Sequence, residues 1–451
     1  MSLSLPVAVV GAGPVGLAAA AHLLNRGIEP LVLEAGAEPA SNLRQWGHVR
    51  LFSPWRYDID AVAASLLRTA GWEAPPDDAL PTGAELVARY LAPLAALPAL
   101  TSRIRLRHRV QAITRLGFDK VLTAGREAAP FVLRVGTPGG DTEILARAVI
   151  DASGTWGQPN PIGAGGIPAL GEAALAGTAA AAASGERGGP IAYGIPDVLG
   201  AERETYAGRA TLVVGAGHSA ANVLLDLAAL ARQAPGTRLL WAVRGKDLSR
   251  VIGGGAADGL PARAALGASL GALRDSGTLE LATEFRIETV STDAAGRMKV
   301  RAADGRVLEG IERIVGATGQ RPDLAITREL RLRLDPWLEC AEALGPLIDP
   351  NLHSCGTVRP HGARELSHPE AGFFTAGVKS YGRAPTFLLA TGYEQVRSIA
   401  ALLAGDVAAA REVRLELPET GVCSTDRASP AAAPKAGGCC PPRPESGGCC
   451  G

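Results

Sequence analysis

The hydrophobic pattern at the start of the chain predicts a strand, a helix and a second strand. The apolar run Val7–Val10 suits a buried parallel strand, and the Ala- and Leu-rich segment that stops at Gly27 suits a helix. A second apolar run, Leu31–Leu33, follows and ends at the acidic Glu34. This order of elements predicts a βαβ unit.

Three glycines lie at the turn between the first strand and the helix. Gly11, Gly13 and Gly16 have the spacing G-x-G-x-x-G. Gly11 allows the tight turn, Gly13 lets a pyrophosphate approach the backbone, and Gly16 brings the helix close to the strand. Glu34 is placed to accept hydrogen bonds from a ribose 2′-OH. The triplet alone is weak in a chain with 56 glycines, but in this order of elements it favours a dinucleotide site over a plain βαβ unit.

A second fingerprint lies in the stretch ATLVVGAGHSAA. Gly215 and Gly217 lie at a predicted strand-to-helix turn, His218 and Ser219 follow, and Ala220 stands where the third glycine would be. Alanine at that position still permits close packing of the helix. The chain therefore contains two predicted dinucleotide folds.

The two fingerprints differ in the charge that follows them. The strand Leu239–Val243 ends in Arg244, with Lys246 and Arg250 nearby, where the first unit has an acid. Cations at this place suit a 2′-phosphate, which favours NADPH over NADH here and FAD at the first fingerprint. The alternative is that they are ordinary surface cations.

Further alternating segments predict more strands. Phe131–Val135 and Glu143–Ile150 lead into Asp151–Gly154, and Met298–Ala302 and Val307–Val315 lead into Gly316–Gly319. Both arrangements predict crossovers between two nucleotide-binding domains, so the first domain is expected to be discontinuous. Toward the C-terminus, Thr386 and Gly405 are expected to bracket a helix as N-cap and C′.

Composition and charge limit the classes of partner. Lys plus Arg and Asp plus Glu balance at 45 each, which argues against a general nucleic-acid or anionic-membrane surface. The first residues carry no basic region, and no apolar run approaches the roughly 18 residues of a membrane span. Seven cysteines would be an odd number for a disulfide-stapled secreted chain. A soluble cytoplasmic protein with a small-molecule substrate is expected.

In the order of its motifs the chain resembles the two-dinucleotide-domain flavoproteins. The resemblance covers roughly residues 5–410 and rests on both fingerprints, on Gly316-Ala-Thr-Gly319 before Gln-Arg-Pro322, and on the C-terminal GFFTAGVKSYGRAPTFLLATGYEQVRSI. It implies an α/β fold with two Rossmann-like dinucleotide-binding domains, of the glutathione reductase and flavin monooxygenase type. A disordered Cys-rich tail is expected after them.

The expected division of the chain follows from this resemblance. Residues 1–160 form the first part of an FAD-binding domain, and residues 315–415 form its second part. Residues 161–314 form an NADPH-binding domain with a low-complexity insert at 163–189, and residues 416–451 form the tail.

Two branches of this superfamily compete. Pyridine nucleotide-disulfide reductases carry a redox Cys pair and an Asp that holds the FAD ribityl chain, whereas here no such pair precedes the tail and Val378 replaces the Asp. The flavin monooxygenase branch tolerates both absences, and its Gly-x-Gly-x-Ser-Ala fingerprint is similar to Gly215–Ala220. Its F-x-G-x-x-x-H motif is missing, and the stretch from Gly194 to Gly208 occupies that place.

Three segments narrow the resemblance further. HVRLFSPW, LHSCGTVRPHG and KSYGRAPTFLLATGYEQVRS are similar to the flavin monooxygenases of arsenic-resistance operons. That resemblance implies an FAD- and NADPH-dependent monooxygenase that uses dioxygen to oxidise trivalent arsenicals to pentavalent forms. Alternatives are a flavin monooxygenase of an amine or thioether, a thiol-dependent flavoprotein metal reductase, and a metal-binding chaperone on a degenerate flavoprotein scaffold.

The flavin ring is expected where the segment Trp46–Trp55 and the loop Lys379–Thr386 converge. Thr386 at a helix start would direct N–H groups toward the flavin pyrimidine. The alternative for these aromatic and cationic residues is ordinary domain-interface packing. The cofactor-binding candidates are Gly11, Gly13, Gly16, Glu34, Arg44, Trp46, Gly215, Gly217, His218, Ser219, Ala220, Arg244, Gly319 and Thr386. The catalytic candidates are Trp55, Cys355, Lys379 and Tyr381.

Cysteine bears on the substrate. The adjacent pairs Cys439-Cys440 and Cys449-Cys450 are substrate-binding candidates, because soft thiolates chelate thiophilic ions. The alternative is a dispensable tail. Cys355 is the body thiol expected to meet substrate, with a buried structural role as its alternative, and Cys340 is expected to be structural. The His and Cys spacing matches no standard zinc site, so no bound metal is expected.

Overall fold

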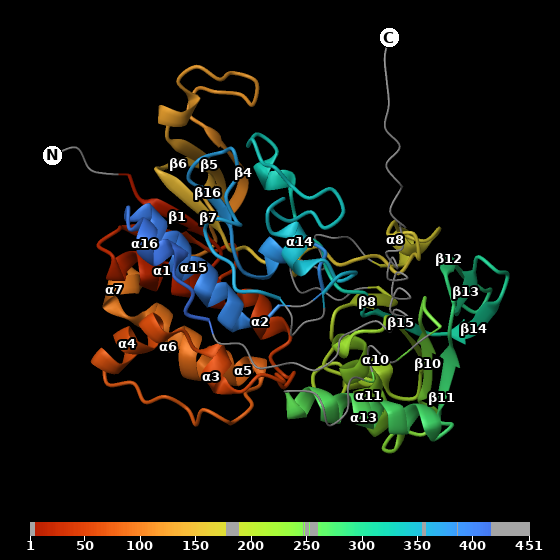
Figure 1. The fold of residues 1–451 in the computed structure, drawn as a ribbon. Helices are drawn as coiled ribbons and strands as arrows, with labels where there is room; N and C mark the ends of the chain where they lie inside the picture. The colour runs from red at the N-terminus through yellow and green to blue at the C-terminus, as the bar shows by residue number, and fades with distance from the viewer. Residues whose placement is uncertain are drawn as a thin grey trace, which may run out of the picture.

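Two five-stranded parallel sheets form the framework of the protein (Figure 1). The computed structural model describes residues 5–176, 189–246, 248, 252, 260–353, 358–385 and 387–415. Each sheet carries helices on one face and a three-stranded antiparallel meander on the other. The two sheets lie in separate halves of the ribbon.

The first sheet has the strand order β16-β7-β1-β2-β3. All of its neighbouring strands pair in parallel, with Val9 opposite Val32 and Ile150. Its fifth strand, β16, comes from far along the chain and pairs with β7. The strands are β1 (Val7–Val10), β2 (Pro30–Leu33), β3 (Ile104–Arg105), β7 (Ala148–Asp151) and β16 (Phe373–Thr375).

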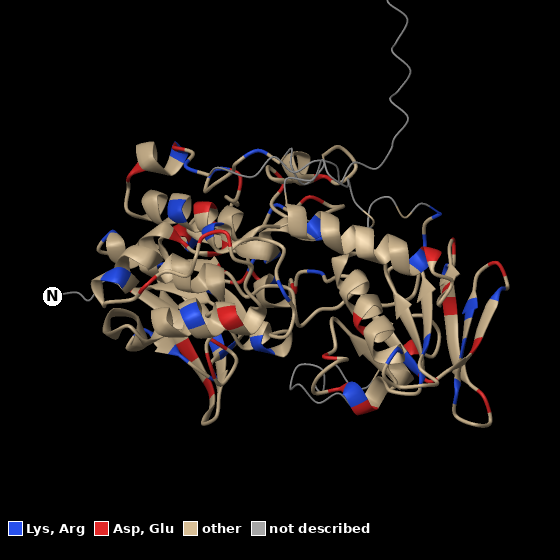
Figure 2. Ribbon diagram, turned by 90° about the horizontal axis from the view of Figure 1, so that it is seen from below, with Lys and Arg blue, Asp and Glu red and all other residues tan. Residues whose placement is uncertain are grey.

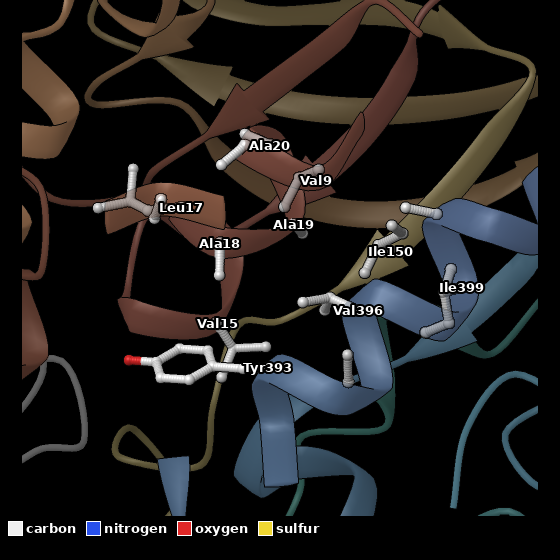
Figure 3. Close-up of a cluster of buried hydrophobic side chains, with 14 of the residues drawn as sticks. Val9, Val15, Leu17, Ala18, Ala19, Ala20, Ile150, Tyr393, Val396 and Ile399 are labelled. Atoms are coloured by element: carbon white, nitrogen blue, oxygen red, sulfur yellow. The ribbon is translucent and has the colours of Figure 1, made fainter. Parts of the chain in front are cut away.

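Both faces of β1 are buried, which explains its unbroken apolar sequence. Val7 and Val9 pack against the helices, whereas Ala8 and Val10 pack against the meander β4–β6. Figure 3 shows Val9 and the alanines of α1 (Pro14–Asn25) facing Val396 and Ile399 of α15 (Leu389–Leu403). The meander consists of β4 (Arg109–Arg115), β5 (Phe131–Thr137) and β6 (Gly140–Ala146).

The second sheet repeats this plan with the order β11-β10-β9-β15-β8. Val213 and Trp241 face the helices α11 (His218–Ala231) and α13 (Pro261–Asp275), and Leu212 and Leu240 face the second meander. The strands are β8 (Ile191–Tyr193), β9 (Ala210–Val214), β10 (Arg238–Ala242), β11 (Leu279–Ala282) and β15 (Arg313–Gly316). The meander strands are β12 (Ile287–Thr292), β13 (Met298–Ala302) and β14 (Val307–Ile311).

A layer of short helices follows β2. One of its helices, α5 (Gly83–Leu86), is capped by Thr82, whose hydroxyl accepts from the Glu85 N–H in a capping box. The helices of this layer are α2 (Ser41–Gln45), α3 (Trp55–Asp58), α4 (Ala61–Thr69), α5 (Gly83–Leu86), the π-helix η1 (Val87–Leu91), α6 (Ala92–Ala96) and α7 (Pro98–Thr101). The other short helices are η2 (Arg126–Ala128), α8 (Glu172–Leu175), α10 (Arg203–Tyr206), η4 (Ala325–Thr327), α14 (Gly345–Ile348), the 3-10 helix η5 (Gly377–Tyr381) and α16 (Val407–Arg411).

Two strands expected to be continuous are each divided in two. The expected strand Glu143–Ile150 is wrong because the Arg147 N–H donates to Pro6 O, where the chain leaves β6 and joins the first sheet as β7. The expected strand Val307–Val315 is wrong for the same reason. At Glu312 the chain leaves the meander and its backbone N–H donates to Ala210 O of the second sheet.

The C-terminal helix starts later than expected. α15 begins at Leu389 with Leu388 as its N-cap, so the N-cap expected at Thr386 is wrong. Gly405 has φ +80° directly after the C-cap Ala404, as expected for a C′ glycine.

Part of the low-complexity insert is folded. Glu172 of α8 is 1% exposed and accepts hydrogen bonds from the Ile162 and Ala169 N–H groups and from the Tyr193 hydroxyl. These bonds satisfy a buried carboxylate without a cation. Residues 177–188 of the insert lie outside the described part of the chain.

Charges of both signs are spread over the elements rather than gathered by sign (Figure 2). Arg297 with Asp293 and Arg306 with Asp304 are examples of local opposite pairs. Among the described residues, no helix has both the length and the apolar character needed to cross a membrane.

Candidate functional site

In the first glycine turn, a side chain would clash at Gly11 and at Gly16, whereas Gly13 has free space around it. Gly11 has φ +96°, and a Cβ on it would lie 2.8 Å from Ala152 O. A Cβ on Gly16 would lie 1.9 Å from Gly11 O, so this glycine sets the close approach of α1 to the turn. Gly13 is the N-cap of α1, and a Cβ there would meet nothing within 4 Å. The turn therefore fits a pyrophosphate at Gly13, against free N–H groups of the helix.

Glu34 closes the same turn from the end of β2. Its Oε2 accepts from the Ala12 N–H and its Oε1 from the Gly36 N–H, both at 2.8 Å. A carboxylate has further lone pairs on each oxygen, so these two bonds leave acceptor capacity for ribose hydroxyls. The position predicted for Glu34 therefore fits a dinucleotide.

The second glycine turn has the same construction. Gly215 has φ +135°, and a Cβ on it would lie 2.2 Å from Ala317 O of the following crossover. Gly217 is the N-cap of α11 and is open, as Gly13 is. His218 and Ser219 are the first two residues of α11, and Ala220 is fully buried against the sheet. The two turns are thus built alike, with alanine in place of the third glycine in the second.

The remaining cofactor-binding candidates lie around these turns. Arg44 of α2 is half exposed and its Nε lies 2.9 Å from Glu38 Oε2. Trp46 follows α2, and its ring lies 6.5 Å from that of Trp156 in the crossover after β7. Gly319, with φ +82°, lies against the Asn160 amide.

Arg244 lies just after β10, at the carboxyl end of the second sheet. It is exposed, and its Nη1 donates to Ala164 O at 3.3 Å. Lys246 is exposed as well, whereas Arg250 lies outside the described residues.

Lys379 is buried in a charge network that links η5 to the first sheet. Its Nζ lies 2.7 Å from Asp151 Oδ2 and 3.0 Å from Ser153 Oγ, and the Ser153 hydroxyl also donates to Asp151 Oδ1 at 2.6 Å. Both charged side chains are at most 1% exposed. The catalytic candidate Lys379 thus holds the turn against which Gly11 packs.

The neighbouring Val378 points outward and is 41% exposed. One of its methyl groups lies 3.9 Å from where a Cβ on Gly154 would be. The residue that replaces an acid of the disulfide reductase pattern therefore lies at the surface of this crossover.

The other two described catalytic candidates lie in packed surroundings. Tyr381 is 3% exposed, with its ring 5.2 Å from Phe387 edge-on and 5.5 Å from His361. Trp55 is 1% exposed in the helical layer, with the Arg89 guanidinium 5.8 Å from its ring. The structure places Tyr381 and Lys379 on the same short helix and Trp55 on another element.

Several candidates lie outside the described residues. They are Cys355, Thr386, Cys439, Cys440, Cys449 and Cys450, together with Cys423. In the described part of the chain the one cysteine is Cys340, which is 1% exposed. Burial raises the pKa of its thiol to about 12.

The structure adds a buried polar network that the sequence analysis missed. Gln395 of α15 accepts from the Gly377 N–H, and its amide donates to Ser380 Oγ and His361 Nε2. Burial lowers the pKa of His361, so its ring is neutral and can accept. Gln395 stands beside Glu394 and close to Arg397 in the sequence, so no sequence signal marked it as buried.

A second feature that the sequence did not predict is an aromatic contact between the unit of the first sheet and the unit of the second sheet. The ring of Phe52, from the segment before α3, lies 5.2 Å from the ring of His218 at the start of α11. The guanidinium of Arg263 in α13 lies 5.9 Å from the same Phe52 ring. An aromatic residue that belongs to the first unit therefore contacts the second glycine turn.

Comparison with known proteins gives the fold a class. A model of the NAD(P)-binding Rossmann-like domain matches residues 9–69. No curated protein matches the chain. The bacillithiol disulfide reductase from Bacillus cereus is similar in structure, with a TM-score of 0.64 at 18% identity over 89% of this chain and 99% of that one.

Two monooxygenases are similar over comparable lengths. The flavin-containing monooxygenase from Stenotrophomonas maltophilia has a TM-score of 0.55 at 21% identity, over 89% of this chain and 98% of that one. The FAD-bound cadaverine monooxygenase from Erwinia amylovora has a TM-score of 0.59 at 14% identity, over 94% of this chain and 100% of that one. The chain therefore has the α/β fold shared by flavin monooxygenases and flavin-dependent disulfide reductases, with a Rossmann-like NAD(P)-binding domain.

Proposed function

We propose that this chain is an FAD-dependent monooxygenase that uses NADPH and dioxygen. The observation that carries the proposal is the pair of similar glycine turns, each open at its central glycine, on two sheets whose described residues hold no accessible thiol. Two such turns supply places for two dinucleotides, one for an electron donor and one for an electron carrier.

The first turn is proposed to hold FAD. Gly13 would receive the pyrophosphate and Glu34 the ribose, while Lys379 and Asp151 fix the turn beneath them. When bound, FAD accepts electrons from a nicotinamide and can pass them to dioxygen. The residues of this chain contribute binding, orientation and exclusion of water.

The second turn is proposed to hold NADPH. Gly217 offers the open N-cap of α11, and the exposed Arg244 after β10 is the cation proposed to meet the 2′-phosphate. The domain division with FAD on residues 1–160 and 315–415 and NADPH on residues 161–314 is part of this proposal. The first sheet supports this division, because its strand β16 follows all strands of the second sheet in the sequence.

Cysteine chemistry separates the proposed class from a dithiol reductase. Attack on a disulfide requires a thiolate, and Cys340 is buried with a pKa of about 12, so it is protonated at neutral pH. The remaining cysteines of the chain lie at 355 and beyond 420. Oxygen transfer needs no thiol in the protein.

The proposed substrate is a trivalent arsenical, which is a soft nucleophile through its lone pair. The resemblance of the segments HVRLFSPW and LHSCGTVRPHG supports it, and the pairs Cys439-Cys440 and Cys449-Cys450 are proposed to bind the arsenical before it reaches the flavin. An amine or a thioether is the alternative substrate class.

The test combines a cofactor assay with product analysis. Purified protein should carry a flavin absorbance, oxidise NADPH, and consume dioxygen in proportion to a pentavalent arsenical when the trivalent form is added. Turnover that is unchanged by the arsenical, with no pentavalent product, would reject the substrate. Dioxygen consumption coupled to an amine or thioether product would establish the alternative. Removal of residues 416–451 should raise the KM for the arsenical and leave flavin content unchanged.

A disulfide reductase is the second candidate function. It is favoured by the likeness in fold to the bacillithiol disulfide reductases, with TM-scores of 0.64 and 0.60. This candidate requires NADPH oxidation without dioxygen, in the presence of a low-molecular-weight disulfide. An anaerobic assay with such a disulfide therefore separates the two functions.

A further inference from the structure

The short helix η5 contacts the surroundings of the first glycine turn on two sides. Its first residue, Gly377, has φ +72°, and a Cβ on it would lie 3.3 Å from Val15 in the first turn of α1. Two residues later, Lys379 Nζ bonds to Asp151 Oδ2 at the end of β7. η5 therefore touches both the helix that follows the glycine turn and the crossover against which that turn packs.

Between these two contacts η5 reaches the surface at one residue. Val378 is 41% exposed and lies beside Gly154 of the crossover, whereas the other four residues of η5 are buried. The place of Val378 next to the glycine turn is thus set by how the buried part of η5 is held.

Gln395 of α15 holds η5 from below at both of its ends. Its Oε1 accepts from the Gly377 N–H and its Nε2 donates to Ser380 Oγ, both at 2.8 Å. The Ser380 hydroxyl in turn donates to Gly377 O at 2.7 Å. The packing of α15 is close at the same point, because a Cβ on Gly392 would lie 2.5 Å from a Val15 methyl group.

His361 fixes the orientation of the Gln395 amide. Its Nδ1 lies 3.0 Å from Arg359 O, and a carbonyl only accepts, so Nδ1 carries the hydrogen. Its Nε2 then accepts from Gln395 Nε2 at 2.9 Å. Both hydrogens of the amide are used in this way, and a rotated amide would turn its NH₂ group against the Gly377 N–H. The network therefore admits one orientation of Gln395.

The charged groups on either side of this network are engaged elsewhere. Glu365 accepts from a backbone N–H at 3.0 Å, and Glu394 pairs with Arg397 at 2.7 Å. Gln395 is fully buried and His361 is 4% exposed, so water does not compete for their bonds. Satisfied networks of buried polar groups fix a single arrangement of the elements that they join.

We propose that Gln395 is a positioning residue for the flavin site. Through Gly377 and Ser380 it fixes η5 against α1 and the crossover, and so sets where Val378 and Lys379 stand beside the first glycine turn. The inference rests on the proposed binding of FAD at that turn. It gives a buried amide of the C-terminal helix a part in the affinity and the orientation of the flavin.

The test compares the full chain with its Gln395→Met variant, which keeps the size of the side chain and removes its three hydrogen bonds. FAD is titrated into protein freed of flavin by dialysis against bromide, and binding is followed by quenching of flavin fluorescence. The Kd for FAD should rise about tenfold, as expected for the net loss of one or two hydrogen bonds. The visible circular dichroism of the bound flavin should change, and the Kd for NADP⁺ should not.

Further variants separate positioning from a general loss of stability. With Gln395→Glu the network re-forms if His361 donates from Nε2, so at pH 6 this variant should bind FAD within about twofold of the wild type. Nitrogen-15 NMR should show a doubly protonated His361 in this variant, and a neutral ring in the wild type at pH 7.5. Ser380→Ala removes one bond and should raise the Kd about threefold. Gln111→Met, at an exposed amide bonded to Asp141 in β4, should behave as wild type.

The outcomes separate this inference from the proposed function. A Gln395→Met protein that binds FAD as tightly as the wild type, or that loses affinity for FAD and NADP⁺ alike, would overturn the role of Gln395 alone. If Gln395→Met does not fold, Ser380→Ala decides, and an unchanged Kd with unchanged flavin circular dichroism would then overturn the role. A wild-type chain that carries no flavin and binds none would overturn both the inference and the proposed FAD site.

Discussion

Lys379 and Asp151 form an ion pair with a distance of 2.7 Å between Nζ and Oδ2, inside the protein and 228 residues apart in sequence. The pair joins η5 to the carboxyl end of β7, and Ser153 completes it as a third member. Because Gly11 packs against Ala152 and Ser153, this charge network supports the first glycine turn from below.

Breaking the Lys379–Asp151 pair from one side should destabilise the fold strongly. Lys379→Met or Asp151→Asn leaves a buried charge without its partner, which costs about 3–5 kcal/mol. The double variant Lys379→Met, Asp151→Leu should lose less than either single variant, because no charge remains. Urea unfolding measures the effect, and Glu143→Gln, which removes an exposed partner of Arg134, should change stability by less than about 1 kcal/mol.

Valine at the two open glycines should block the two nucleotide sites separately. Gly13→Val should reduce flavin content at least tenfold, and Gly217→Val should raise the KM for NADPH at least tenfold with flavin retained. Both residues have negative φ and no atom within 4 Å of a Cβ, so the fold tolerates the change. Gly139→Val in the remote β5–β6 hairpin is the matched control.

An equal loss of flavin from both glycine variants would contradict the assignment of one nucleotide to each turn. Flavin absorbance per protein and the NADPH concentration dependence are measured on the same preparations. Circular dichroism then shows that the variants retain their secondary structure.

The glycine turns could be predicted from sequence because their signals are local. Val7–Val10 is buried on both faces and so is apolar throughout, and Gly16 packs against Gly11 within the same βαβ unit. The boundaries at Arg147 and Glu312 could not be predicted in this way. There the chain changes its pairing partner without any change in its apolar pattern.

The hydrophobic and polar pattern of the sequence also could not predict polar partners that lie far apart in the chain. Lys379 is a sequence candidate, but its partner Asp151 lies 228 residues away at the end of β7. Gln395 has the sequence context of a surface residue, although its three hydrogen-bond partners are buried. The contact of Phe52 with His218 depends on how the two sheets' units meet. Such contacts follow from tertiary packing, so local sequence propensities cannot predict them.

Cys340 should be chemically inert in the folded protein. Its thiol is buried and has a pKa of about 12, so the reactive thiolate is scarce at pH 8. Iodoacetamide followed by mass spectrometry should label Cys340 only after denaturation. Cys340→Ala should leave NADPH oxidation unchanged, and rapid labelling of Cys340 in the native chain would contradict the burial described here.

Arg244 should set the preference for NADPH over NADH. Arg244→Ala removes the cation proposed to meet the 2′-phosphate, so the KM for NADPH should rise about tenfold and the KM for NADH should stay the same. Arg238→Ala, at the start of β10 where Arg238 pairs with Glu280, is the matched control. Equal rises for both nucleotides would show that Arg244 supports the turn rather than reading the phosphate.

Asp58 should make the protein less stable as the pH rises toward neutrality. Its pKa is raised from 3.8 to about 7 in the folded state, so the folded chain binds the proton more tightly than the unfolded chain does. The stabilisation is fully present below pH 4 and is lost as pH passes through 7, with a slope of about 1.4 kcal/mol per pH unit between these values. Other groups titrate in the same range, so the quantity to measure is the difference between wild type and Asp58→Asn. Urea unfolding from pH 4 to pH 8 should show the wild type losing stability relative to the variant, and a difference independent of pH would mean that Asp58 is ionised in the folded protein throughout.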